Sequence, residues 1–146
     1  MRWATLAFVT LLAACTDLRD FRGAWAGDRV GESPALHVGP GSHATLRIDA
    51  LDAHGLAARF AVEGLVPETT VESTPGAEAD SLANLTFAGA PLHVYLCFVD
   101  VPARPDAASG QALVLVALFD DHRIEVRVIR GGTSPLYAIF ALAEAP

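Results

Sequence analysis

The chain has 146 residues, of which 52% are hydrophobic and 18% are charged, and its formal net charge is -7. This composition is too apolar for a disordered chain and, with 12 Gly and 9 Pro, too interrupted for a helical bundle. The acidic balance disfavours nucleic-acid binding, which depends on clusters of Lys and Arg, and it also disfavours a polybasic surface for anionic lipid. We expect one globular domain of ordinary size.

The N-terminal segment has the layout of a secretory signal peptide. Arg2 precedes an apolar run from Trp3 to Leu12, which is shorter than the ~20 residues that a spanning helix needs. The run ends in Leu12-Ala13-Ala14-Cys15, which resembles the lipobox of bacterial lipoproteins. The resemblance implies a signal peptide over residues 1–14, lipid on Cys15, and a membrane-anchored protein of the bacterial cell envelope. Ordinary secretion with cleavage nearby and a structural segment are the alternatives.

The lipidated N-terminus and a short linker occupy residues 15–20, and a single β-domain is expected over residues 21–146. Five residues from Thr16 to Asp20 reach at most ~17 Å, so the domain would sit close to the membrane. Thr16 beside the cysteine, with Asp17 one position further, resembles the signal for sorting to the outer membrane.

The hydrophobic pattern of the mature chain has a period of two almost throughout, which predicts β-strands. Composition predicts a turn at 52–55, a long loop at 100–111 and short connections at 120–122 and 131–135. We therefore expect an all-β fold, a single antiparallel meander of about eight or nine strands. A small barrel and a two-sheet sandwich both fit, with the barrel slightly favoured. The predicted strands are 21–27, 45–51, 56–63, 82–87, 92–99, 112–119, 123–129 and 136–142, and 35–38 and 69–72 are candidates for a further short strand.

Two of these strands are apolar on both faces. Residues 112–119 carry no polar side chain, and 136–142 carry only the hydroxyl of Tyr137. The neighbouring strand alternates instead, with Arg123, Glu125 and Arg127 predicted to face solvent. A strand that is apolar on both faces is usually covered on both. Either a loop such as 101–109 packs over the outer face, or an apolar patch is exposed to a partner, a second subunit or a lipid.

The Gly23-x-Trp25 motif in the first strand resembles that of lipocalins and their calycin relatives. The resemblance implies a barrel that Trp25 closes at one end, covered by an arginine from a late strand, a role for Arg127 or Arg130. An aromatic core residue beside a glycine explains the same residues without any family.

Residues suited to catalysis or metal binding are few. Cys97 lies in an apolar strand, where a free cysteine usually behaves as a small buried hydrophobe, and a lipidated Cys15 would leave it without a disulfide partner. The histidines are scattered and lack metal-ligand spacing, and no nucleophile motif or phosphate loop occurs. We predict no catalytic residue, no metal and no cofactor.

Three functions follow as hypotheses. The first is a non-enzymatic envelope lipoprotein, whose small β-domain binds a partner protein or another envelope component through apolar strand faces. The second is a lipocalin-like carrier of a small apolar ligand, which needs an open cavity behind Trp25. The third is inhibition of an envelope or host hydrolase by a projecting loop. The oligomeric state is left open by the sequence.

Overall fold

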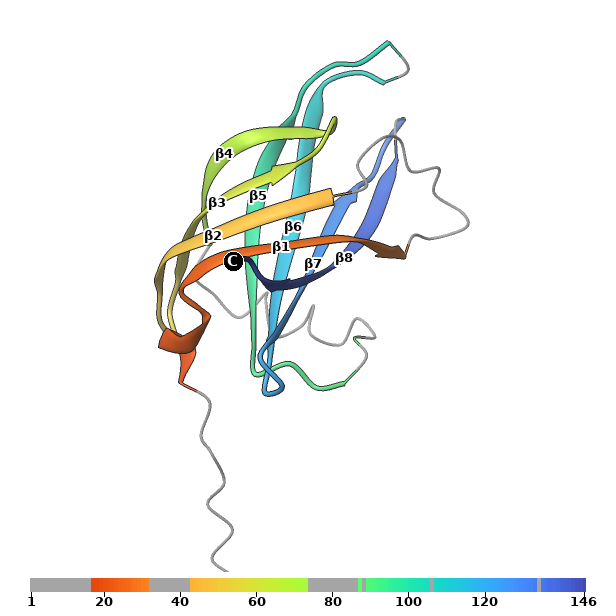
Figure 1. Ribbon diagram of the computed structural model, residues 1–146. Helices are drawn as coiled ribbons and strands as arrows, with labels where there is room; N and C mark the ends of the chain where they lie inside the picture. The colour runs from red at the N-terminus through yellow and green to blue at the C-terminus, as the bar shows by residue number, and fades with distance from the viewer. Residues whose placement is uncertain (1–16, 32–42, 74–86, 88, 106, 134) are drawn as a thin grey trace, which may run out of the picture.

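The computed structural model describes residues 17–31, 43–73, 87, 89–105, 107–133 and 135–146. A short 3-10 helix, η1 (Leu18–Phe21), precedes eight strands that pair antiparallel in the order β4-β3-β2-β1-β8-β7-β6-β5. The two edge strands, β4 and β5, lie next to each other, so the sheet is nearly closed into a barrel (Figure 1). The strands are β1 (Gly23–Gly31), β2 (His43–Leu51), β3 (Leu56–Val62), β4 (Val66–Glu72), β5 (His93–Val101), β6 (Gly110–Phe119), β7 (Arg123–Arg130) and β8 (Leu136–Glu144).

The predicted all-β meander is confirmed, and its first element differs from the expectation. Phe21 ends a helix instead of starting a strand, because the carboxylate of Asp17 accepts a hydrogen bond from the backbone N–H of Arg19 and caps η1. β1 begins two residues later, at Gly23. The candidate strand at 35–38 lies outside the described residues. So does the predicted strand at 82–87, except for Phe87, which belongs to no strand.

The interior of the barrel is one continuous cluster of buried side chains. Trp25, Leu46 and Phe60 stand opposite one another on β1, β2 and β3, and each is at most 2% exposed. Phe140 of β8 and Cys97 of β5, both fully buried, belong to the same cluster. Because alternate residues of each strand face inward, the period of two in the sequence defines the core directly.

The turn at 52–55 joins β2 and β3 as predicted. The carboxylate of Asp52 accepts hydrogen bonds from the backbone N–H groups of His54 and Gly55, at 2.7 and 2.9 Å. These two bonds lower the pKa of Asp52, because they stabilise the ionised carboxylate. The Tyr95 hydroxyl donates to the carbonyl oxygen of Asp52 at 2.7 Å, which ties this turn to β5 across the end of the barrel.

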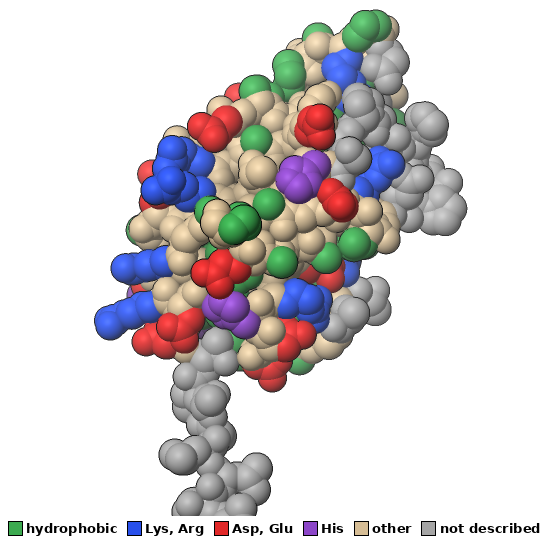
Figure 2. Space-filling model, in the orientation of Figure 1, with side chains coloured by type: hydrophobic (Ala, Val, Ile, Leu, Met, Phe, Trp, Pro, Cys, Tyr) green, Lys and Arg blue, Asp and Glu red, His purple; other side chains and the backbone are tan. Residues whose placement is uncertain are grey.

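The outer surfaces of the two halves of the barrel differ in polarity. On β2 and β3, Asp49 lies 3.4 Å from both Arg47 and Arg59, and all three side chains are solvent-exposed. Figure 2 shows charged side chains spread over the face that β1 to β4 turn toward the viewer. On β6, by contrast, the outward-facing Leu115 and Phe119 are buried.

The outer face of β6 is covered by a different segment from the predicted loop at 101–109. Phe87 of the β4–β5 connection packs edge-on against Phe119, with ring centroids 6.1 Å apart. The loop at 101–109 instead projects from one end of the barrel (Figure 1). Strand 112–119 is therefore covered on both faces, whereas the outward-facing Tyr137 and Ile139 of β8 are half-buried.

Glu125 and Arg127 of β7 face outward, as predicted, but the expectation that they are solvated is wrong. They are 6% and 5% exposed, and the Arg127 Nε donates to the Glu125 Oε1 at 2.7 Å. The Arg127 guanidinium lies 4.1 Å from the centroid of the Phe87 ring, and its Nη1 donates to the Tyr137 hydroxyl at 3.4 Å. The aromatic ring over Arg127 helps to exclude water, so an ion pair that would ordinarily be solvated is buried.

We predict that Glu125→Gln lowers the free energy of unfolding by about 3 kcal/mol, because it removes the charge opposite a buried guanidinium. The double variant Glu125→Gln/Arg127→Met should be more stable than the single one, since neither charge is then buried. Urea denaturation measures both effects. The control is Asp49→Asn on the polar half, where loss of exposed ion pairs should cost less than about 1 kcal/mol. Equal losses in Glu125→Gln and Asp49→Asn would contradict the prediction.

Candidate functional site

The meander places alternate connections at opposite ends of the barrel. Helix η1, the β2–β3 and β6–β7 turns and the end of β8 lie at the end where the described chain begins. The β3–β4 turn, the β5–β6 loop and the β7–β8 loop lie at the other end (Figure 1). We call these the η1 end and the far rim.

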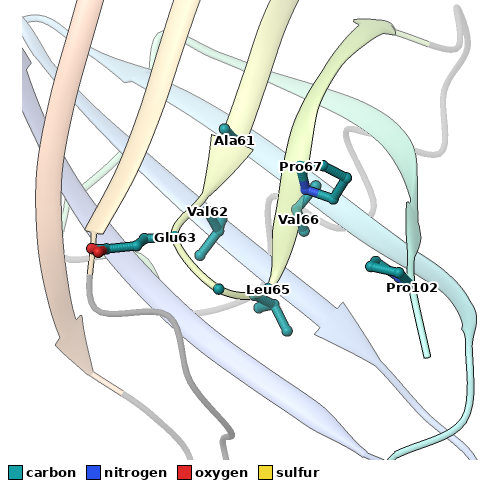
Figure 3. Close-up of a pocket in the computed structure, with 8 residues that line it drawn as sticks. Ala61, Val62, Glu63, Leu65, Val66, Pro67 and Pro102 are labelled. Carbon is teal, nitrogen blue, oxygen red and sulfur yellow. The ribbon is translucent and has the colours of Figure 1, made fainter. Parts of the chain in front are cut away.

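Two adjoining hollows open at the far rim, and we refer to them together as the rim groove. The first, of about 420 Å³, is lined by the β3–β4 turn with its flanking residues and by Pro102 (Figure 3). The second, of about 410 Å³, is lined by Pro67, the end of β5 and the start of β6. Pro67 and Pro102 border both hollows, which makes the groove continuous.

The groove lies where the two edge strands of the barrel meet. Pro67 is the second residue of β4, and Pro102 directly follows β5. Proline has no backbone N–H and cannot donate to a strand ladder, so this part of the seam is poorly suited to hydrogen bonding between β4 and β5. Both proline rings are exposed and form apolar walls, and Leu65 and Val66 lie buried beside them.

Carboxylates accompany the apolar walls. Glu63 lines the first hollow and Asp100 lines the second, and both residues are solvent-exposed. In Figure 3 the Glu63 side chain extends on the side of the turn away from Pro102. Among the described residues that line these two hollows there is no Lys, Arg or His. The groove is therefore apolar in its walls and negative at its outer margins, where the Glu63 carboxylate lies on the outer side of the β3–β4 turn.

A third, smaller hollow of about 230 Å³ continues from the second along the far rim, sharing Ser109, Gly110 and Gln111 with it. Arg130 at the end of β7 lines this hollow and is 9% exposed. Its Nη1 donates to the carbonyl oxygen of Ala108 at 3.3 Å. The arginine thus joins the end of β7 to the β5–β6 loop that borders the groove.

Trp25, the first of the predicted site residues, lies inside the barrel toward the η1 end. Its Nε1 donates to the carbonyl oxygen of Phe21 at 2.8 Å. Its ring packs against those of Phe21 and His122, at centroid distances of 5.9 and 5.1 Å. Trp25, Phe21 and His122 together form an aromatic plug at this end.

The structure does not bring Trp25, Arg127 and Arg130 together. Arg127 lies on the outer face of β7, whereas Trp25 belongs to the interior cluster. Trp25 pairs with Glu144, and Arg130 pairs with Leu136 at the opposite end of β8, about 26 Å away along the strand. Cys15, the predicted lipidation site, lies outside the described residues.

Neither the rim groove nor the role of His122 was predicted from the sequence. The groove is built from residues that are typical of turns and loops. These residues come together only because β4 and β5 are neighbours in the folded barrel. His122 adopts a left-handed backbone conformation, with φ of 56°, in the β6–β7 turn. That conformation is uncommon outside glycine, though His is among the residues that tolerate it. Here it accompanies the packing of the imidazole against Phe21 and Trp25.

Cys97 is a free cysteine, and its surroundings oppose a role as a catalytic nucleophile. The thiol is fully buried in the core, and burial raises its pKa to about 12. A nucleophilic cysteine needs a low pKa and partial exposure. Among the described residues, no three His, Cys, Asp or Glu side chains are grouped so that they could hold a metal ion.

Comparison with known proteins gives no relative. The sequence matches no protein-family model, and neither the curated proteins nor the solved structures include a significant match. In the described part of the chain, no helix has the length and apolar character required to cross a bilayer.

We predict that Cys97 makes the protein sensitive to alkali. The folded state holds the thiol proton up to about pH 12, whereas the pKa of an exposed thiol is about 9. Above pH 9 the unfolded chain loses this proton first, so the free energy of unfolding should fall by up to about 1.4 kcal/mol per pH unit. Urea denaturation between about pH 8 and pH 11 should show a shallower decline in Cys97→Ala than in the parent. An identical decline in both proteins would contradict the assignment.

Proposed function

We propose that this protein is a lipid-anchored, non-enzymatic β-barrel of the bacterial cell envelope that binds a partner protein through the rim groove. The observation that carries the proposal is the position of the groove, at the end of the barrel opposite the start of the described chain. The lipobox-like Leu12-Ala13-Ala14-Cys15 supports the anchor.

The described N-terminus supports a close attachment to the membrane. An extended linker would reach furthest from the bilayer, but Leu18 to Asp20 belong to η1. A 3-10 helix rises about 2.0 Å per residue, less than an extended chain does. Phe21 at the end of η1 is fully buried against the Trp25 ring. A lipid on Cys15 would therefore hold the η1 end of the barrel near the bilayer surface.

The length of the strands then separates the groove from the membrane. A strand of nine residues, such as β1 or β5, spans about 30 Å along its axis, or roughly 20 Å along a barrel with tilted strands. The far rim would face away from the bilayer at this height. A groove in that position is accessible to other proteins of the envelope.

The interior of the barrel supports a partner protein over a small apolar ligand. A carrier needs space behind Trp25, and that position is packed by Phe21 and His122. Buried side chains from all eight strands belong to one interior cluster. The groove, by contrast, offers apolar walls that are already open to solvent. Aliphatic and proline side chains of this kind provide contact area rather than proton transfer.

The anchor is tested by metabolic labelling with a fatty-acid analogue. The parent protein should incorporate the label and sediment with membranes, and Cys15→Ala should do neither, because only the cysteine thiol accepts the lipid. Cys97→Ala is the matched control and should be labelled like the parent. Continued labelling of Cys15→Ala would rule out the proposed anchor.

Partner binding at the far rim is tested by site-specific photocross-linking in intact cells. A benzophenone amino acid at Gln111, which is exposed in the rim groove, should give a discrete protein adduct. The same group at Arg47, on the polar outer face of β2, should give none. Adducts from the probe at Arg47 but not from the probe at Gln111 would show that the partner binds elsewhere and would contradict binding at the groove.

A further inference from the structure

The shape and charge of the rim groove indicate which class of ligand it can bind. We infer that the groove binds an extended peptide segment of the partner, with apolar side chains in the two hollows and Lys or Arg beside Glu63 and Asp100. This inference rests on the proposed function, because it names the occupant of the same surface.

The arrangement of the hollows favours an extended segment. They lie side by side and share Pro67 and Pro102 at their common border, instead of forming one deep enclosed cavity. In an extended chain, alternate side chains point to the same face and are about 7 Å apart. Two such side chains can enter neighbouring hollows while the peptide backbone passes over the proline rings. A compact ligand would fill only one hollow and leave the other open.

The lining determines which side chains fit. Exposed Pro67 and Pro102 supply the walls, and buried Leu65, Val66 and Val101 supply the floor. This surface suits aliphatic or aromatic side chains, which gain from the removal of apolar area from water. Polar side chains in the hollows would lose hydrogen bonds to water that the aliphatic lining cannot replace.

The charges at the margins determine what flanks the apolar side chains. Glu63 and Asp100 are exposed acidic residues, and the whole chain has a net charge of -7. Cationic side chains of the partner would lie against these carboxylates, whereas an anionic ligand such as a fatty acid would be repelled. Each exposed pair of this type alters affinity by up to about fivefold.

Nine-residue synthetic peptides test the inference with the purified full-length protein in detergent. All contain Leu alternating with Ser, and they differ only in having Lys, Ser or Glu at both ends. The Lys-flanked peptide should bind about tenfold more tightly than the Glu-flanked one, measured by fluorescence anisotropy. Glu63→Arg/Asp100→Arg should reverse this order. Asp49→Arg, on the polar outer face of β2, adds positive charge elsewhere and should preserve it.

Backbone amide resonances locate the bound peptide. The Lys-flanked peptide should shift the signals of Leu65, Val101 and Gln111, and dodecanoate, the fatty-acid probe, should not. An unchanged preference in Glu63→Arg/Asp100→Arg would overturn the inference, as would tighter binding of dodecanoate or no binding of any peptide. None of these results alters the cross-linking expected from Gln111. Loss of that cross-link would instead count against the proposed function itself.

Discussion

A strand that is apolar on both faces needs cover on both sides, and this constraint on β6 shapes the rest of the barrel. Its inward face packs into the interior cluster, and its outward face is covered at Phe119 by Phe87. Phe87 belongs to the connection between β4 and β5, residues 73–92, which is far longer than a hairpin turn. The Glu125–Arg127 pair lies beneath the same ring and gains its burial there. The segment that links the two edge strands thus also covers the outer face of β6 at Phe119.

The rim groove follows from the same arrangement. β4 and β5 are neighbours in space but are not a hairpin, so no tight turn sets their register. Pro67 and Pro102 stand on either side of the seam and lack the N–H groups that a ladder would need. The barrel therefore closes by side-chain packing at this position and leaves two apolar hollows at its far rim. An exposed edge of a sheet is a surface to which a segment of a partner can bind.

Local patterns predicted much of the fold. The alternation in β2 and β3 and the Asp52 turn between them could be read directly, because each depends on residues adjacent in sequence. The burial of Arg127 could not be predicted from a local pattern. The alternation of β7 predicts that the side chain points outward, but its exposure depends on Phe87, forty residues away in the sequence. The lipocalin resemblance implied a role for Trp25 at one end of the barrel. The packing of Phe21 and His122 against Trp25 depends on a helix cap and on an uncommon backbone conformation, which no local pattern in the sequence indicates.

If the protein is anchored as we propose, the acidic margins of the groove also disfavour contact between the groove and membrane lipid. Acyl chains of lipids that leave the bilayer would fill apolar hollows as readily as leucine side chains do. Contact with acyl chains would, however, strip water from Glu63 and Asp100 without supplying an opposite charge, which carries a large desolvation penalty. A peptide with Lys or Arg beside its apolar residues supplies that charge. In the proposed complex, the two carboxylates would therefore act mainly by disfavouring acyl chains, whereas the hydrophobic walls would provide the affinity for the peptide.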